Sequence, residues 1–346
     1  MIKYIGENLI AKKNAGSKAR QDVERILAGV YSKFFDMKEI PSNSSFMRKL
    51  ILVFSPKSLF SFLSIQRASK KDYYFLQYPF YYIGTYNRLL TSFISKNNCI
   101  LFVHDIDALR FSGKQSINEE IALLNQSRCV ILHNNRMKQI LVRYGLTVPT
   151  ITLEVFDYLL KNDLPKIDYV LSNEIVFAGN LEKSQFLRKI PNMKSSLSFR
   201  LYGNGLPESL KNIPNIHWMG SFLPEEIPYR LKGSFGLVWD GTSLNTCDGK
   251  IGEYLKINNP HKLSLYIAAG LPVIVWSQAA IAELVQKYQI GFTINGLEEI
   301  PDKITNINQE IYEKYKHNIK KLQKKVTSGY FTKKSLSTME TILKAK

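Results

Sequence analysis

The stretch NPHKLSLYIAAGLPVIVW, residues 259–276, constrains the fold of this chain more than any other segment. Its order predicts a helix, a tight turn and a buried strand. Pro260 is typical of a helix start, Gly270 of the left-handed residue that follows a helix, and Pro272 prevents the helix from continuing. The same local pattern fits any helix–strand unit of a doubly wound α/β domain, so other segments must decide what this unit does.

Apolar runs alternate with helical patterns along the 346 residues, which indicates mainly parallel sheets covered by helices on both faces. The length suffices for two α/β domains with separate cores. The polar stretch KNDLPKID, residues 161–168, interrupts the alternation, and we interpret it as a linker. The sequence therefore predicts an α/β chain of two Rossmann-like domains, residues 1–160 and 169–326, facing each other across a cleft lined by the carboxyl ends of both sheets.

The elements expected from these patterns can be stated by residue range. Strands are predicted at 73–76, 99–104, 129–132, 151–153, 174–178, 198–202, 236–239, 272–276 and 291–294. Helices are predicted at 17–29, 86–96, 136–144, 222–232, 261–269, 279–287 and 329–343. The lysines of residues 314–325 recur at the spacing of the solvated face of an amphipathic helix.

The charge balance points to an anionic partner. There are 47 basic and 29 acidic residues, a formal net charge of +18, which suits a nucleotide diphosphate, an acidic membrane surface or nucleic acid. Cys99, Cys129 and Cys247 have neither metal-ligand nor CxxC spacing, which indicates a reducing compartment. The apolar stretch at the N-terminus is too short for a signal peptide, and no run has transmembrane length. We therefore expect a cytoplasmic protein, with peripheral association with a membrane left open.

Glycine-containing strand ends in the second half suggest a binding edge. In FAGNLEKS, Gly179 and Asn180 follow a strand, where Gly179 permits close backbone approach to a ligand and Lys183 suits a phosphate. LYGNG places Tyr202 and Gly203 at the end of the next strand, and GSFLPEEIPYRL has a turn before a predicted helix. GLVWDG ends a buried strand at Asp240. Each piece alone fits an ordinary turn; their common order favours a ligand site.

Together these pieces resemble the nucleotide-binding half of glycosyltransferases with the GT-B fold, over roughly residues 173–325. In these enzymes the donor phosphates lie at the start of the helix that 259–276 predicts. Many retaining members carry two glutamates here, where this chain has Ile257 and Leu265. The resemblance instead implies a donor site formed by Lys250, Tyr254, Asn259, Pro260, His261 and Lys262. Two lysines near a pyrophosphate would stabilise departing UDP without a metal ion. The inverting or retaining outcome stays open.

The whole chain is similar to the streptococcal and lactobacillal glucosyltransferases that add glucose to N-acetylglucosamine on serine-rich-repeat adhesins, and to bacterial galactofuranosyltransferases. The similarity lies in NAGSKARQD, LQYPF, HDIDALR, HNNRM and the NPHK block, which start at residues 14, 76, 104, 133 and 259. It implies that the first domain meets the acceptor and the second holds UDP-glucose. It also implies that a C-terminal helix, within residues 327–346, packs back onto the first domain.

The HDID motif supplies candidate catalytic residues His104, Asp105 and Asp107. A carboxylate at the carboxyl end of a strand, facing a cleft, can serve as the general base for an acceptor hydroxyl. We favour Asp105 and expect Asp107 to pair with Arg110. An Asp-x-Asp metal site, as in the other large glycosyltransferase fold, is disfavoured because the motif lies in the first domain, away from the expected nucleotide half. An aspartate that caps the next helix stays open as the alternative. His133 is better explained as a buried structural histidine.

Gly16 and Ser17 precede or begin a predicted helix. A glycine-containing turn before a helix can bind an anion or approach the transferred sugar, although the spacing matches no phosphate-loop fingerprint. We include both residues in the expected donor site.

Three function classes remain. The favoured one is a metal-independent hexosyltransferase that uses UDP-glucose, with no cofactor beyond this substrate, an N-acetylglucosamine-modified serine-rich-repeat protein as acceptor, and a homo-oligomeric state. A galactofuranosyl- or other hexosyltransferase of polysaccharide synthesis is a variant of it. The second class is a non-catalytic GT-B module that binds glycosylated protein. The third, a nucleic-acid binder, rests only on the +18 charge and the aromatic content and has no recognition motif, so we expect no nucleic-acid partner.

Overall fold

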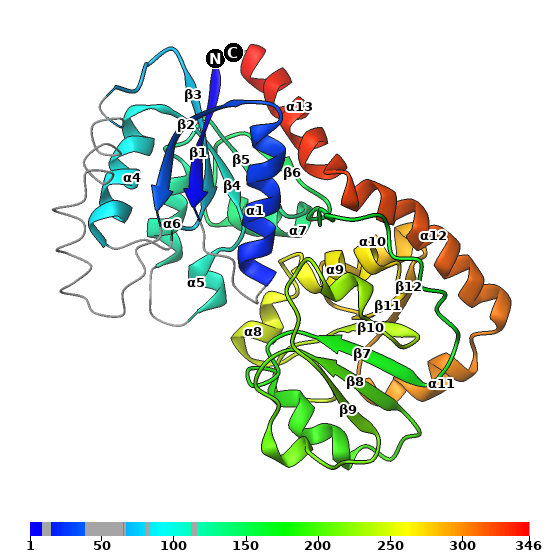
Figure 1. Ribbon diagram of the computed structural model, residues 1–346. Helices are drawn as coiled ribbons and strands as arrows, with labels where there is room; N and C mark the ends of the chain where they lie inside the picture. Colours follow the sequence, from blue (N-terminus) through cyan, green and yellow to red (C-terminus); the bar gives the residue numbers. More distant parts are fainter. Residues whose placement is uncertain (9–14, 39–64, 66, 81–83, 112–115, 346) are drawn as a thin grey trace.

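The computed structural model describes residues 1–8, 15–38, 65, 67–80, 84–111 and 116–345. Two six-stranded sheets, each parallel throughout, form the centres of two domains (Figure 1). The first domain contains β1 (Ile2–Asn8), β2 (Ser32–Lys38), β3 (Tyr73–Tyr78), β4 (Asn98–Val103), β5 (Cys129–Leu132) and β6 (Thr150–Thr152). Its helices are α1 (Ala15–Ala28), α4 (Gly84–Lys96), α5 (Asp107–Arg110), α6 (Ile117–Leu124) and α7 (Asn135–Arg143).

The second domain begins after residues 153–173, which form neither helix nor strand. Its strands are β7 (Glu174–Ala178), β8 (Ser198–Tyr202), β9 (Ile216–Gly220), β10 (Phe235–Val238), β11 (Val273–Trp276) and β12 (Gly291–Ile294). Its α-helices are α8 (Gly249–Tyr254), α9 (His261–Ala269), α10 (Ala282–Tyr288), α11 (Ile300–Thr305) and α12 (Gln309–Thr327). Short 3₁₀ helices are η1 (Gln185–Asn192), η2 (Glu208–Leu210), η3 (Ile227–Tyr229) and η4 (Leu297–Glu299).

The strand order fixes where each sheet can bind a ligand. The first sheet runs β2-β1-β3-β4-β5-β6 and the second β12-β11-β10-β7-β8-β9. The chain changes direction across the sheet between β1 and β3 in one domain, and between β7 and β10 in the other. In open parallel sheets, ligands bind outside the carboxyl ends of the strands at such switch points. The candidate residues after β7 and β10 therefore lie at the expected place.

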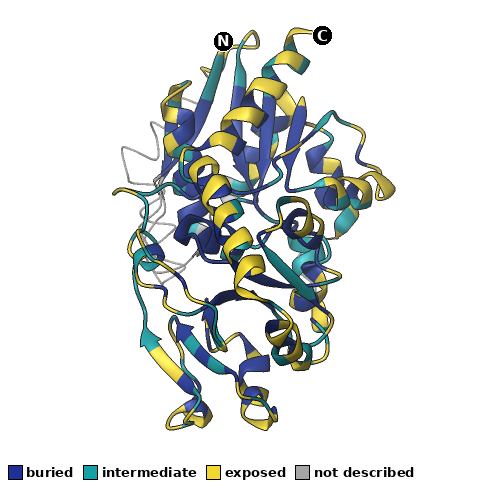
Figure 2. Ribbon diagram, turned by 90° about the vertical axis from the view of Figure 1, so that its right-hand side faces the viewer, coloured by how far each residue is buried: buried dark blue, intermediate teal, exposed yellow. Residues whose placement is uncertain are grey.

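The strands consist largely of continuous apolar runs because both faces of each sheet are covered. β5 and β11 are buried along their whole length, and Figure 2 shows buried strands beneath helices whose outer faces are exposed. One face of the first sheet, including Phe75 and Phe102, belongs to the same apolar cluster as the second domain. The opposite face, including Leu101 and Val130, packs in a separate cluster with α4, α6 and α7.

The last helix, α13 (Tyr330–Lys344), leaves α12 and runs along the first domain (Figure 1). The buried carboxylate of Asp157 accepts the backbone N–H groups of Phe331 and Thr332, at 3.2 and 2.7 Å. Near the other end of α13, Tyr31 donates to Glu340 at 2.6 Å. These bonds fasten the C-terminal helix to the first domain. No helix within the described ranges is both long and apolar enough to cross a membrane.

The helix–turn–strand prediction for residues 259–276 is confirmed. Helix α9 spans His261–Ala269, Gly270 adopts a left-handed φ of 76°, and β11 starts at Val273. The predicted helix over 222–232 is wrong, because the segment holds only turns and η3. Pro228 lacks a backbone N–H and its ring would clash with the carbonyl of Pro224 in a continuous helix. That carbonyl accepts a hydrogen bond from Tyr158 instead.

Candidate active site

Three of the predicted donor residues meet at the β7–β10 switch point. Gly179 follows β7, Asp240 follows β10, and Lys262 lies in the first turn of α9. The Lys262 Nζ atom lies 2.8 Å from Asp240 Oδ2 and 5.0 Å from the centre of the Phe177 ring. A Cβ atom on Gly179 would stand 3.1 Å from Lys262 Cε, so the absence of a side chain leaves room for the lysine. The result is a partly buried cation beside an open backbone turn.

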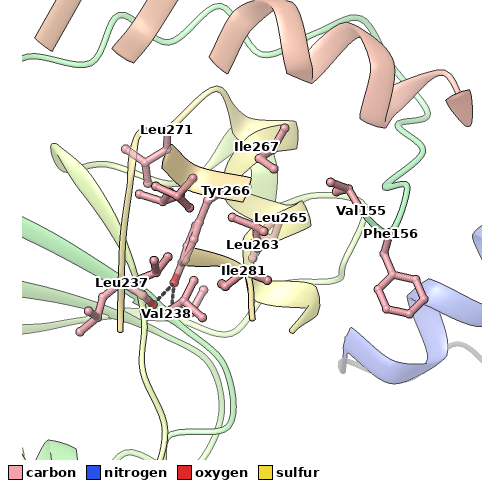
Figure 3. Close-up of a cluster of buried hydrophobic side chains, with 14 of the residues drawn as sticks. Val155, Phe156, Leu237, Val238, Leu263, Leu265, Tyr266, Ile267, Leu271 and Ile281 are labelled. Carbon is pink, nitrogen blue, oxygen red and sulfur yellow. Dashed lines mark hydrogen bonds between the residues drawn. The ribbon is translucent and has the colours of Figure 1, made fainter. Parts of the chain in front are cut away.

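Tyr266, on the same helix, explains how this edge is held in place. Its hydroxyl accepts the N–H of Ala178 at 2.9 Å. It also donates to the carbonyl oxygen of Leu237 at 3.1 Å (Figure 3), so Tyr266 joins the ends of β7 and β10. A Cβ atom on Gly236 would lie only 2.4 Å from the Tyr266 ring, so glycine is required there. The sequence analysis did not identify Tyr266 or Gly236. A tyrosine within an otherwise apolar buried helix was the available signal, because its hydroxyl needs a partner.

Gly203 brings the end of β8 against the same turn. It has a φ of 139°, and a Cβ atom there would lie 1.8 Å from the backbone oxygen of Gly179. The Gly179 N–H donates to the carbonyl of Tyr202 at 2.9 Å, so the two strand ends are in direct contact. Gly203 therefore sets the position of Gly179.

We predict that Gly203→Ala destabilises the protein by about 3 kcal/mol or more, since left-handed strain and a backbone collision add together. Gly145→Ala is the matched control: its φ is 94°, yet a Cβ atom on Gly145 would meet nothing within 4 Å. The control should lower the free energy of unfolding by about 1 kcal/mol, because only the backbone strain applies there. Thermal or denaturant unfolding measures both variants. Equal losses would show that the contact with Gly179 is not tight.

Other predicted donor residues lie around this edge without a structural contact that defines their role. Asn180 and Lys183 are exposed, and Asn180 Oδ1 accepts the backbone N–H of Lys183 at 3.0 Å. Lys250 is exposed on α8. Pro260 is the residue before α9. Their place in the donor site stays a prediction.

Gly16 and Ser17 lie in the first turn of α1, which contacts α9. The connection runs through Lys18: its buried ammonium lies 4.9 Å from the centre of the Tyr158 ring, and that ring stacks on His261 at 5.1 Å. Burial lowers the pKa of His261 to about 3, so near neutral pH it would meet a phosphate as a neutral imidazole. The starts of α1 and α9 thus lie close together across the domain interface.

Three predicted donor residues form hydrogen bonds within the protein. The buried Tyr202 hydroxyl donates to the carbonyl of Arg230 at 3.0 Å and accepts the N–H of Lys232 at 2.9 Å, both within the second domain. The buried Tyr254 hydroxyl accepts the N–H of Ile106 at 2.8 Å. Both hydroxyl groups therefore have partners within the protein, and a contact of either tyrosine with the donor stays a prediction.

Asn259 is the third of these residues, and its buried amide joins the two domains. Its Nδ2 donates to the carbonyls of His133 and Glu154, both at 2.9 Å, and its Oδ1 accepts from Asn134 at 2.7 Å. Its backbone N–H donates to Nδ1 of His133 at 3.0 Å. Both amide hydrogens are thus used within the protein. Asn259 holds the start of α9 against the ends of β5 and β6.

His104 follows β4 at the carboxyl edge of the first sheet and is nearly buried. Its Nε2 lies 2.7 Å from Oε1 of Gln77, and the amide nitrogen of Gln77 donates to the carbonyl of Arg20 at 3.2 Å. Because an amide oxygen only accepts, His104 Nε2 carries the proton. Burial, reinforced by Arg20, holds the pKa of His104 well below its ordinary value. His104 is therefore a neutral imidazole held by Gln77, and its catalytic role stays a prediction.

Asp105 is the better-placed base. Burial raises the pKa of its carboxyl to about 6, against the opposing effect of Arg110. Arg110 forms an ion pair with Asp105. The helix-capping alternative fails for Asp105, because Ile106 precedes α5 and no side chain caps it from that position. Glu120, which the sequence analysis missed, instead accepts the N–H groups of Asp107 and Ala108 at 3.1 and 2.9 Å.

The arrangement suits transfer to a hydroxyl group. The second domain offers a lysine at a glycine-lined strand edge, and the first offers a carboxylate whose pKa lies near the working range of a general base. Among the described residues, no three His, Cys, Asp or Glu side chains are grouped so that they could hold a metal ion.

Comparison with known proteins identifies the family. Residues 3–155 match the N-terminal domain, and residues 175–339 the C-terminal domain, of the glucosyltransferase 3-like family. The chain is 30% identical over 340 residues to the beta-1,6-galactofuranosyltransferase WbbI of Escherichia coli K12, covering 95% of each protein. It is 33% identical over 239 residues to Glucosyltransferase 3 of Streptococcus gordonii, covering 68% of this chain and 69% of that relative.

Solved structures agree on the fold at low sequence identity. HepE of Anabaena, in a complex with UDP-glucose, has a TM-score of 0.57 at 12% identity, with 98% of this chain and 99% of that one covered. Sucrose-phosphate synthase of Thermosynechococcus elongatus has a TM-score of 0.61 at 12% identity, covering 100% and 99%. The chain belongs to the glucosyltransferase 3-like family and is a glycosyltransferase of the two-domain GT-B fold, related to bacterial galactofuranosyltransferases.

Proposed function

We propose that this protein transfers glucose from UDP-glucose to a hydroxyl group of N-acetylglucosamine carried by a serine-rich-repeat glycoprotein. The proposed donor site is supported by one observation: Gly179, Asp240 and Lys262 lie together at the β7–β10 switch point. The acceptor rests on the resemblance to the glucosyltransferase 3-like proteins. The family match and the relative from Streptococcus gordonii support glucose as the transferred sugar.

In the proposed reaction the donor diphosphate lies over Gly179 at the start of α9. Lys262, paired with Asp240 in the free protein, turns its ammonium to the phosphates. A charge-assisted contact to the departing UDP lowers the barrier because negative charge grows there as the bond to the anomeric carbon breaks. The acceptor oxygen forms the new bond to that carbon, and its proton passes to Asp105. No metal ion takes part in this proposal.

A different donor sugar is supported by the match to WbbI. WbbI matches this chain over 95% of both proteins, whereas the glucosyltransferase from Streptococcus gordonii matches over 69% of its length. Galactofuranose transfer from UDP-galactofuranose is therefore the alternative reaction. Both sugars share the UDP group, so the same β7–β10 edge would bind either donor.

A calorimetric screen with UDP-glucose, UDP-galactose, UDP-N-acetylglucosamine and UDP-galactofuranose decides between them. We expect UDP-glucose to bind and to be consumed when an N-acetylglucosamine acceptor is present. Transfer from UDP-galactofuranose alone would establish the alternative. Binding of a donor without transfer or hydrolysis would indicate a non-catalytic module, and failure of all four donors to bind would refute the proposed donor site.

A further inference from the structure

The ion pair between Lys262 and Asp240 at the donor edge is one that a ligand can reach. Its nitrogen and oxygen atoms lie 2.8 Å apart, and the two side chains are 16% and 20% exposed. The ion pair between Lys18 and Asp22 is of another kind, since each of its side chains is only 1% exposed. Partial exposure leaves Lys262 able to exchange its carboxylate partner for an anion that arrives from solvent.

The ammonium group of Lys262 has capacity for a further anion. It carries three N–H groups. One donates to Asp240 at 2.8 Å and another to the carbonyl oxygen of Trp239 at 3.5 Å, both at the end of β10. Within the part of the chain that the structure describes, the third N–H group has no hydrogen-bond partner. An arriving phosphate can therefore bind Lys262 before the carboxylate is released.

The lysine is held at the donor edge by its surroundings. Its ammonium lies 5.0 Å from the centre of the Phe177 ring, and its Cε atom would be 3.1 Å from a Cβ atom on Gly179. Lys262 is also the cation with which Asp240 forms an ion pair among the described residues. A diphosphate bound over Gly179 and the carboxylate of Asp240 would thus compete for the same positive charge.

We propose that Asp240 is an internal competitor of the donor diphosphate: its carboxylate holds Lys262 in the free protein, releases it when the donor binds, and takes it back as UDP leaves. The inference rests on the proposed donor site and adds to it a residue that weakens the binding of the product. A charge-assisted bond to Lys262 would otherwise slow the departure of UDP. Asp240 gives the lysine an alternative partner at the moment when that bond breaks.

Asp240→Asn tests the competition because it removes the charge and keeps the shape of the side chain. We expect the Kd of UDP to fall about 10-fold, with most of the change in a slower dissociation rate. Titration calorimetry measures Kd, and stopped-flow displacement of bound UDP measures the rate. Asp240→Ala, which has no amide group to contact the ligand, should tighten binding as well. Unchanged or weaker UDP binding in both variants would overturn the inference.

The Lys262→Ala background shows whether Asp240 acts by competing for the lysine. In that background Asp240→Asn should lower the Kd of UDP by no more than about 3-fold, because only the screened repulsion between the carboxylate and the diphosphate remains. The same 10-fold gain in both backgrounds would overturn the inference, since Asp240 would then act through its charge alone. Unchanged UDP affinity in Lys262→Ala by itself is a different failure, because it would refute the proposed donor site.

Glu208→Gln is the matched control for net charge. It also removes one negative charge from an ion pair with a lysine, but Glu208 and Lys211 are 84% and 52% exposed and precede β9. This variant should leave the Kd of UDP unchanged. A gain in affinity equal to that of Asp240→Asn would indicate a general effect of charge and would also overturn the inference.

Discussion

Asp105→Asn should reduce turnover by roughly 100-fold or more while UDP affinity stays near that of the parent. The carboxamide keeps the shape of the side chain, and its oxygen can still accept from Arg110, but it cannot take up the acceptor proton. Burial sets the pKa of Asp105 at about 6, so the carboxyl is ionised at neutral pH. Turnover of the parent should accordingly decline as the pH falls through about 6. Steady-state kinetics with a fixed acceptor measures both effects.

Asp107→Asn provides the control for this prediction. Asp107 begins α5, and its backbone N–H, which the substitution retains, donates to Glu120. We expect a smaller loss than for Asp105→Asn. Full turnover in both variants would exclude the HDID motif from proton transfer. If instead EDTA silences the enzyme and manganese restores it, the carboxylates act as metal ligands and the base mechanism is wrong.

Lys262→Ala should weaken UDP binding by about 1.5–3 kcal/mol, or roughly 10- to 150-fold in Kd, because it removes a charge-assisted contact with the diphosphate. The ammonium is partly buried beside Gly179, where water screens it less than at the open surface. Titration calorimetry with UDP gives the affinity directly. Thermal unfolding of the same variant measures any loss of stability that results when Asp240 has no ion-pair partner.

Two further lysines sharpen this test. Lys250→Ala should also weaken UDP binding, though by less, because Lys250 is exposed. Lys211→Ala should leave UDP affinity unchanged. Lys211 pairs with Glu208 and precedes the start of β9, whereas the donor residues follow the carboxyl ends of the strands. Unchanged UDP affinity in both Lys262→Ala and Lys250→Ala would show that the donor is placed wrongly.

The sequence predicted the buried parallel strands well and the other elements less well. Residues 129–132 and 174–178 match β5 and β7, because apolar runs between turns identify strands covered on both faces. Residues 198–202 match β8, although Arg200 interrupts its apolar run. It missed β1, β2 and β9. β1 and β2 carry charges along their length, including Lys3 and Glu7 in ion pairs, and β9 is an edge strand with an exposed Trp218. A search for apolar runs does not find such strands, because polar and charged residues interrupt their apolar pattern.

The candidate site shows a similar division. Gly179, Asp240 and Lys262 follow strands or start a helix, and the rule that strand ends share one edge is enough to bring them together. Tyr254 and Asn259 lie in the same block of sequence, yet their polar groups bind the first domain, more than 100 residues away. Sequence spacing within one domain contains no information about which polar side chains the opposite domain will satisfy. The hydrogen bond between His104 and Gln77 was not predicted either, because it joins neighbouring strands of one sheet that are far apart in the sequence.

The central claim is that UDP binds the carboxyl edge of the second sheet while the first domain supplies the base. Hydrogen–deuterium exchange of the full chain with and without UDP tests it most directly, because bound ligand suppresses local opening where it contacts the backbone. We predict protection concentrated at residues 178–184, 240–250 and 259–263, with the segment 104–110 changed little. Protection centred on 104–110 with an unchanged second domain would contradict the account.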